Sequence, residues 1–242
     1  MVMVGAERLA QVFVEVADTL VDDFDVIEFL NMITLRAAEL ADVAAVGLLL
    51  DDGRGRLQFM AASDERTKLL ELFQVQNNEG PCLDAFTTGL PVVNADLGTA
   101  SDRWPTFAPR AAASGFGSVH ALPMRLRTTV IGALNLFGTS TGRLDDADVR
   151  ILQALADVAT IGLLQEKALR QAEVLTEQLQ HALNSRIAIE QAKGALARGL
   201  GVGVDDAFDV LRTYARSRNL KLAEVAQRVL TEPGTLPGLL PG

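Results

Sequence analysis

The spacing of apolar residues changes several times along the chain, and each spacing predicts one kind of element. In 6–21, and again from Ile27 to about Leu40, apolar side chains recur every three or four residues, which predicts two helices. Asp25 stands where it can cap the second of them. Apolar runs bounded by turn residues predict strands at 43–50, 57–63, 115–124 and 129–138. Helices that flank an antiparallel sheet make an α+β domain.

Further segments separate these strands. Residues 65–76 return to the helical period, and a brief helix is expected after the loop around Trp104 and Pro105. The stretch 76–94 is rich in turn formers such as Gly80 and Gly89. It predicts a loop that ends in a short edge strand at 91–94.

The second half of the chain begins with a long helical pattern. From Asp145 to Arg198 there is no proline, and only two glycines interrupt the pattern. About 50 helical residues would span roughly 75 Å, which is too long for the inside of one small domain. A heptad reading places these residues at the a and d positions: Ile151, Ala154, Val158, Ile161, Gln165, Ala168, Ala172, Leu175, Leu179, Ala182, Arg186 and Ile189. We therefore expect a coiled coil in which the helix 151–189 pairs with a second copy of the chain. The alternative, a solvated linker helix without a partner, is disfavoured because long helices that lack apolar packing are unstable in water.

Residues 184–230 predict a unit of three helices. Gly199, Gly201 and Gly203 can end the long helix, because glycine tolerates the positive φ of a helix C-cap. A second helical stripe runs from Phe208 to Ala215 and a third from Leu222 to Val229, with Asn219 breaking the chain between them. Beyond this unit, 231–242 contains three prolines and three glycines and is expected to be a flexible tail.

Charge is distributed unevenly between this unit and the rest of the chain. Residues 184–230 carry eight Lys and Arg against five Asp and Glu, a balance of +3, whereas the remaining residues carry 14 against 26, a balance of −12. A basic module on an acidic protein is a candidate for binding a polyanion, since neutralising phosphates supplies much of the affinity for nucleic acid. The same charges also fit an ordinary solvated helix surface.

Three motifs in this unit carry a family resemblance. They are IEQAKG at 189–194, AF-x-x-LR at 207–212 and AR-x-x-N-x-KL-x-x-VA at 215–226. Together they resemble the ANTAR domain, the RNA-binding output module of bacterial transcription antitermination regulators. The resemblance implies that the protein binds, as a dimer, paired small stem-loops in a nascent transcript and so prevents a terminator from forming.

Cationic side chains of this module are the expected contacts to RNA. Arg and Lys bind loop phosphates, and guanidinium planes stack on unpaired bases. The expected RNA-binding residues are Arg186, Lys193, Gly194, Arg212, Arg216, Arg218, Asn219 and Lys221. Asn219 fits either a base contact or a helix stop, and Gly194 would admit either RNA or a packing helix close to the backbone. Tyr214 falls on the apolar stripe and is assigned to the core.

The segment of about 25–165 carries a second resemblance. The order of its helices and strands, the segment EGPCLDAF at 79–86 before GLPVV, and the paired strands that end in GALNLFG are similar to a GAF domain, a sensory fold found ahead of many bacterial output modules. The resemblance implies a small-molecule ligand for this domain. It names neither the ligand nor a cofactor, because one fold hosts many functions.

Catalytic and metal-binding patterns are sparse. Cys82 and His120 are the only nucleophile and base that could pair, and we assign them instead to the sensor pocket and the core. A single cysteine and two histidines give no metal-ligand spacing, and we expect neither a metal site nor enzymatic activity. No apolar run of about 18 residues and no leader pattern is present, which predicts a cytoplasmic protein without a membrane span.

These observations predict four segments: an N-terminal helix at 1–24, a GAF-like α+β sensor at 25–165, a coiled-coil helix with a three-helix ANTAR domain at 166–230, and the tail. The expected function is a signal-responsive, RNA-binding transcription antitermination regulator that acts as a homodimer. Two other functions stay open. One is a DNA-binding regulator, suggested by the glycine-bearing turn before the second helix of the basic unit. The other is a redox enzyme that uses Cys82.

Overall fold

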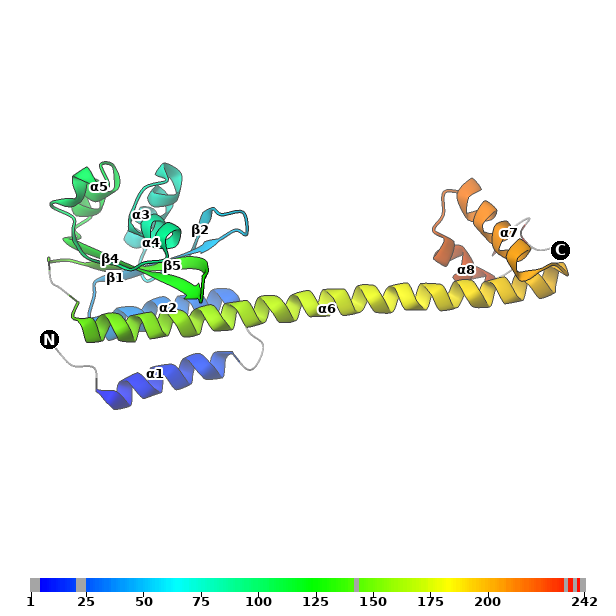
Figure 1. Cartoon of the computed structure of the whole chain (residues 1–242), viewed down its shortest axis with the longest axis horizontal. Helices are drawn as coiled ribbons and strands as arrows, with labels where there is room; N and C mark the ends of the chain where they lie inside the picture. The colour runs from blue at the N-terminus through cyan, green and yellow to red at the C-terminus, as the bar shows by residue number, and fades with distance from the viewer. Residues whose placement is uncertain (1–4, 21–24, 142–143, 233–234, 237–238, 240–242) are drawn as a thin grey trace. The chain divides into compact units, whose positions relative to one another are not determined.

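The computed structural model describes residues 5–20, 25–141, 144–232, 235–236 and 239. The chain divides into two compact units, Met1–Lys167 and Ala168–Gly242, and each unit has its own hydrophobic core. The first unit contains the sheet and the second contains helices (Figure 1).

A single antiparallel sheet organises the first unit. Its strands are β1 (Ala45–Asp51), β2 (Leu57–Ala62), β3 (Val92–Asp96), β4 (Ser118–Leu126) and β5 (Thr129–Gly138). They lie in the order β2-β1-β5-β4-β3, and every neighbouring pair is antiparallel. The predicted strands are therefore present, and the short strand predicted after Pro91 lies at the edge of the sheet as β3.

Helices cover both faces of this sheet (Figure 1). On one face, Leu134 and Leu136 of β5 pack with α1 (Ala6–Thr19), α2 (Val26–Ala41) and the beginning of α6 (Asp146–Leu200). On the other face, Ala133 and Phe137 pack with α3 (Glu65–Asn77), α4 (Pro81–Thr88) and α5 (Phe107–Ala113). This partition follows from the period of two in a strand, which sends successive side chains to opposite faces.

The two N-terminal helices are fixed by a cap and by ion pairs. Asp25 accepts hydrogen bonds from the backbone N–H groups of Ile27 at 2.8 Å and Glu28 at 3.0 Å, as the sequence predicts for an N-cap. Arg36 of α2 pairs with Glu15 of α1 at 2.7 Å, and hydrogen bonding to this guanidinium lowers the pKa of the Glu15 carboxyl. The helix α1 therefore packs against the sheet-containing unit.

The prediction of an uninterrupted loop at 76–94 is wrong, because α4 forms within it. Pro81 occupies the first turn of α4, where its missing N–H costs nothing, and Gly89 ends the helix with φ of 65°. The segment is short and begins and ends with turn formers, so its turn signals hid a helix of 8 residues. A brief 3-10 turn at Ala100–Asp102 follows before α5.

The second unit is built from the end of α6 together with α7 (Val204–Ser217) and α8 (Leu222–Thr231). Gly201 with φ of 68° follows α6, and Asn219 with φ of 53° separates α7 from α8, so both predicted breaks are observed. Leu236 and Leu239 are buried against the three-helix core. The expectation of a flexible tail is therefore wrong at these two residues, because both side chains pack against the apolar surface of the three helices.

Candidate functional site

Two regions of the molecule hold the residues singled out by the sequence: the surface of the three-helix unit and the interior of the sheet-containing unit. In the three-helix unit, Leu196 of α6, Leu211 of α7 and Val225 of α8 form a fully buried core. Amphipathic helices that bury this face turn their cationic residues outward. Arg186, Arg212, Arg216, Arg218, Asn219 and Lys221 are all exposed, and Lys193 is partly exposed.

Two of these cations flank an aromatic ring. The Lys193 ammonium lies 5.3 Å and the Arg212 guanidinium 5.7 Å from the centroid of Phe208. Phe208 is partly exposed and joins α6 to α7 at the surface, whereas the sequence placed it on the apolar core stripe. The spacing of four residues from Phe208 to Arg212 was the available signal, because i and i+4 side chains lie on one helix face. We name Lys193, Phe208 and Arg212 the cation–aromatic cluster.

The two cations of this cluster form only weak ion pairs with acidic residues. Lys193 pairs with Glu190 at 3.0 Å and Arg212 pairs with Asp209 at 2.7 Å, both one helical turn apart. Both carboxylates are more than half exposed, so solvent screens each pair and its contribution is about 0.5 kcal/mol or less. A phosphate group could therefore displace these carboxylates at little cost.

A second basic group lies where α7 turns into α8. The Arg218 guanidinium stacks 3.8 Å from the ring centroid of Tyr214, which is 7% exposed and belongs to the core. Asn219 ends α7, its N–H bonding to the carbonyl of Arg216 at 3.2 Å, and its side chain is exposed. The structure therefore gives Asn219 the helix-stop role and leaves its amide accessible.

Gly194 lies in the interior of α6 with open space around it. A Cβ atom at Gly194 would meet no atom within 4 Å other than its chain neighbours and the backbone of its own helix. Packing among the described residues therefore does not require a glycine here, although glycine in a helix interior costs about 1 kcal/mol relative to alanine. Arg186 is exposed two turns earlier on the same helix.

The helix α6 presents two different faces along its length. In the first unit it buries Leu152, Leu155, Ala156, Ala159 and Leu163 in the core, whereas the predicted seam residues Ala154, Ile161 and Gln165 are exposed. In the second unit, residues 168–184 of α6 are all exposed. Leu175 and Leu179 of the predicted seam are 55% and 63% exposed, and Leu183 beside them is 53% exposed. The seam residues from Ala168 to Ala182 are therefore available for a contact outside the chain, whereas Ile151, Val158 and Ile189 pack against the cores of the two units.

Within the first unit, Cys82 and His120 do not come together. Cys82 is fully buried at the beginning of α4, and its thiol donates to the carbonyl oxygen of Ala133 at 3.8 Å. Burial raises the pKa of the Cys82 thiol, and the nearby Glu71 carboxyl raises it further. Val119 and Ala121 face the α3–α5 layer, so His120 between them points to the opposite face of the sheet.

His120 has a structural environment of its own. It is 1% exposed, and its Nδ1 atom accepts a hydrogen bond from the backbone N–H of Asn94 at 2.9 Å. Burial lowers the pKa of His120 to about 4. The side chain therefore stays neutral at neutral pH and ties β4 to the edge strand β3, and the sheet itself separates it from the Cys82 thiol.

A buried polar network that the sequence did not reveal lies beside Cys82. The Glu71 carboxyl accepts hydrogen bonds from Asn135 Nδ2 and from Gln74 Nε2, both at 2.8 Å, and Gln74 Oε1 accepts the backbone N–H of Cys82 at 3.3 Å. Glu71 is fully buried, and burial raises its pKa to about 8 although the Asn135 hydrogen bond opposes this. A Cβ atom at Gly47 would overlap the Glu71 carboxyl, so the glycine makes room for it. The network joins α3, the start of α4 and β5.

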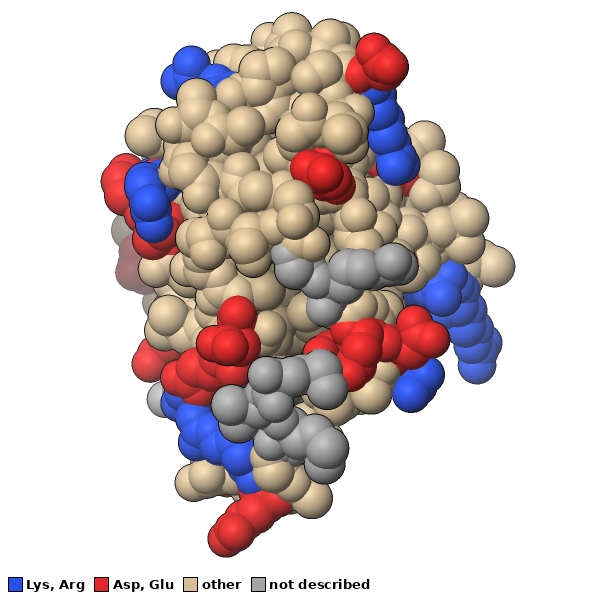
Figure 2. Space-filling view, turned by 90° about the vertical axis from the view of Figure 1, so that its left-hand side faces the viewer, with Lys and Arg blue, Asp and Glu red and all other residues tan. Residues whose placement is uncertain are grey.

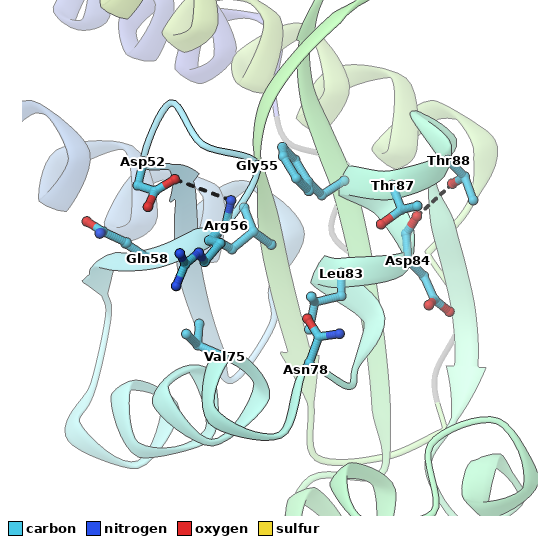
Figure 3. Close-up of a pocket in the computed structure, with 12 residues that line it drawn as sticks. Asp52, Gly55, Arg56, Gln58, Val75, Asn78, Leu83, Asp84, Thr87 and Thr88 are labelled. Atoms are coloured by element: carbon cyan, nitrogen blue, oxygen red, sulfur yellow. Dashed lines mark hydrogen bonds between the residues drawn. The ribbon is translucent and has the colours of Figure 1, made fainter.

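A cavity opens next to this network, between the β1–β2 hairpin and the helices α3 and α4 (Figure 3). Its volume is about 600 Å³. Its lining comprises Asp52, Gly55, Arg56, Leu57 and Gln58 of the hairpin, Val75 and Asn78 at the end of α3, and Leu83, Asp84, Phe86, Thr87 and Thr88 of α4. Neither Cys82 nor His120 belongs to this lining, so the cavity differs from the sensor pocket that the sequence predicted.

The described residues offer neither a metal-binding cluster nor a membrane-spanning helix. Across the described ranges, no cluster of three or more His, Cys, Asp or Glu side chains could hold a metal ion. Among the helices described, none is both long and apolar enough to cross a membrane. Figure 2 shows one face of the sheet-containing unit, on which Lys and Arg are scattered among Asp and Glu.

The chain consists of a sheet between two helical layers, a long helix and a basic three-helix unit. A model of the GAF domain matches residues 25–164, and a model of the ANTAR domain matches residues 177–230. The chain therefore belongs to the GAF domain family and carries an ANTAR domain behind the GAF domain. No curated protein matches the chain.

Solved structures share the fold of the first unit. The GAF domain of a phosphoenolpyruvate-protein phosphotransferase from Coxiella burnetii has a TM-score of 0.56 at 14% identity, covering 69% of this chain and 99% of that chain. The phycoerythrobilin-bound GAF domain of a cyanobacterial phytochrome has a TM-score of 0.53 at 11% identity, covering 67% and 97%. Free methionine-R-sulfoxide reductase from Neisseria meningitidis has a TM-score of 0.51 at 20% identity, covering 69% and 93%. At these identities the likeness concerns the fold alone.

Proposed function

We propose that this protein is a signal-responsive regulator of transcription antitermination, in which the ANTAR domain binds RNA stem-loops and the GAF domain controls that binding. The observation that carries the proposal is the cation–aromatic cluster on the surface of the ANTAR domain. Single-stranded loops are recognised by cations at their phosphates and by aromatic or guanidinium planes against unstacked bases. Lys193, Phe208 and Arg212 supply both kinds of group at one place.

The remaining cations extend the proposed RNA surface in two directions. Arg216, Arg218 and Lys221 continue it around the turn between α7 and α8, and Arg186 and Gly194 continue it along α6. Gly194 would let an RNA backbone approach the helix, because no side chain of the described residues fills the space above it. Exposed cations raise the rate and affinity of binding in a salt-dependent way.

We infer further that the protein acts as a homodimer through 151–189 of α6. The support is that the face with Leu152 and Leu155 is already buried in the GAF domain, whereas Leu175 and Leu179 remain exposed in a single chain. A helix whose apolar side chains face water is stabilised by pairing with another helix. A signal in the GAF domain would then act on RNA binding by changing the pairing of α6 and the spacing of two ANTAR domains.

The test is a titration with RNA recovered by crosslinking in the host. The chain and its variant Arg212→Gln are titrated with this RNA, carrying its stem-loops, and with duplex DNA of the same sequence, at several salt concentrations. We expect RNA to bind more tightly than DNA. We expect Arg212→Gln to weaken RNA binding about tenfold. The slope of log affinity against log salt concentration should fall by about one, the value for one phosphate contact.

Arg54→Gln is the matched control, because it removes the same charge from an exposed hairpin of the GAF domain. This variant should bind RNA like the unmodified chain. If both variants lost RNA affinity equally, binding would depend only on the overall charge of the chain, which would contradict the proposal. Tighter binding to duplex DNA would replace it by a DNA-binding function.

We propose no catalytic activity for this chain. The redox alternative would need a reactive Cys82, but burial raises the pKa of its thiol and the sheet separates it from His120. Cys82→Ser should therefore leave RNA binding and its regulation unchanged. Loss of regulation in Cys82→Ser, together with turnover of an oxidised substrate by the unmodified chain, would favour the redox enzyme.

A further inference from the structure

The cavity between the β1–β2 hairpin, α3 and α4 is lined by both apolar and polar side chains. Leu57 of the hairpin is buried, and Leu83 and Phe86 of α4 line the cavity with partly exposed side chains. Arg56 and Gln58 come from the hairpin side and Asn78 from the side of α3 and α4 (Figure 3). Apolar side chains beside polar groups that can fix the orientation of a ligand are features of small-molecule sites.

The two acidic residues of the lining already accept hydrogen bonds from other groups of the protein. Asp52 closes the hairpin by accepting hydrogen bonds from the backbone N–H groups of Arg54 at 2.8 Å and Arg56 at 3.3 Å. Asp84 binds the Arg103 guanidinium at 2.8 Å and accepts from Trp104 Nε1 at 3.2 Å. Each carboxylate therefore holds the protein structure through one of its oxygens, and Asp84 is already paired with a cation.

Arg56 is the one cationic residue among the described residues that line this cavity. Within the described ranges its guanidinium has neither a hydrogen bond nor an ion pair, and its backbone alone is held by Asp52. A guanidinium offers five N–H donors in a planar fork that matches a carboxylate. A single cation near the Asp52 carboxylate favours a ligand with one negative charge, since Asp52 would repel a more highly charged phosphate more strongly.

We propose that this cavity binds a small organic monocarboxylate, with its carboxylate on Arg56 and its apolar body on Leu83 and Phe86. This assignment rests on the proposed function in that the ligand would be the signal controlling RNA binding. The wall that it contacts is α4, which the buried network joins to α3 and β5 through Gln74 and Glu71. Binding would thus act on elements that contact the strand leading toward α6.

The only tryptophan of the chain reports on this cavity. Trp104 is 1% exposed, and its indole N–H donates to Asp84, a residue of the cavity lining. Its fluorescence in the full-length chain can therefore be titrated with 4-phenylbutyrate as the probe, with the neutral 4-phenylbutyramide and the cationic 4-phenylbutylamine as its isosteres. Amide resonances of Gly55, Asn78 and Thr87 in an NMR titration locate the probe independently.

We expect 4-phenylbutyrate to bind saturably and at least about tenfold more tightly than its amide, because a charge-assisted hydrogen bond is lost with the amide. Arg56→Gln should reduce the affinity for the acid about tenfold without changing that for the amide. Arg54→Gln, in the same hairpin but outside the cavity lining, should change neither.

Three results would overturn the assignment: no saturable binding, equal affinity for acid and amide, or equal losses in Arg54→Gln and Arg56→Gln. Probe-induced shifts away from Gly55, Asn78 and Thr87 would also overturn it. RNA binding and probe binding by the unmodified chain separate the two proposals. Intact RNA binding without probe binding contradicts only the ligand site, whereas absence of RNA binding contradicts the proposed function.

Discussion

Replacing Glu71 by glutamine should make the stability of the GAF domain almost independent of pH between 6.5 and about 8. Glu71 is fully buried and its pKa in the folded domain is about 8, against an ordinary value of 4.5. In this range the folded domain keeps a proton that the unfolded chain has released. Stability is therefore greatest at low pH and is lost as the pH rises through the folded pKa.

The magnitude follows from proton linkage. One proton held only by the folded state changes the free energy of unfolding by about 1.4 kcal/mol for each pH unit. From pH 6.5 to about 8 the unmodified domain should lose between about 1 and 2 kcal/mol, since the proton is half released at the upper end. His120, whose pKa falls from 6.5 to about 4, has the opposite slope, but only below pH 6.5. The chosen window therefore isolates Glu71.

Glutamine is a close mimic of the neutral acid. Both side chains offer one donor end and one acceptor, and both can bond to Asn135 and Gln74. Asn135 Oδ1 is buried without a partner among the described residues, so it can accept a hydrogen bond if the amide turns. We therefore expect Glu71→Gln to be about as stable as the unmodified chain at pH 6.5 and more stable at pH 8.

The assay is urea unfolding of the full-length chain, followed by the fluorescence of Trp104, which is buried in the GAF domain. Glu65→Gln on the same helix is the control, because Glu65 is exposed and pairs only with Lys68 at 3.1 Å. This control should keep the full pH dependence. An unchanged slope in Glu71→Gln, or a slope lost equally in Glu65→Gln, would refute the reasoning.

Three further predictions concern the ANTAR domain and α6. Gly194→Ala should stabilise the domain by about 0.5 to 1 kcal/mol, because alanine favours a helix interior, and should weaken RNA binding. Gly199→Ala, in the last turn of α6, should leave RNA binding unchanged; unfolding is followed by the single tyrosine, Tyr214, and equal effects on RNA would contradict the proposed approach at Gly194. Phe208→Leu should keep the stability within about 0.5 kcal/mol and lower RNA affinity about fivefold or more, as measured by anisotropy, since base stacking is worth about 1–3 kcal/mol. Leu179→Glu should convert a dimer to a monomer in sedimentation at equal protein concentration, while Val174→Glu on another face of α6 should not; a monomeric unmodified chain would contradict the dimer outright.

The order of elements could be predicted from the sequence because it depends on local periodicity. Amphipathic helices repeat apolar residues with a period of 3.6, and the strands are short apolar runs bounded by turn residues, so both patterns are visible in the printed sequence. The breaks at Gly201 and Asn219 were also local, because positive φ selects these residue types. The helix α4 was missed because its capping residues are the same residues that mark turns.

The residues whose burial and contacts depend on the tertiary structure could not be predicted, because burial is a property of the assembled fold. Glu71 looks like any polar residue of an amphipathic helix until α3 packs over Gly47 and brings it to Asn135. Phe208 looks like a core residue until α6 and α7 place Lys193 and Arg212 around it. Contacts between segments far apart in sequence have no local signature.

The sequence by itself determined the kinds of element, their order, the basic character of the last three helices and the apolar seam along α6, since all of these depend on residue type and spacing. Only the tertiary structure decided that the sheet separates Cys82 from His120, that the Arg56 guanidinium beside a cavity has no partner among the described residues, and that Glu71 keeps its proton. The physical reason is that desolvation and charge pairing are set by which surfaces meet on folding.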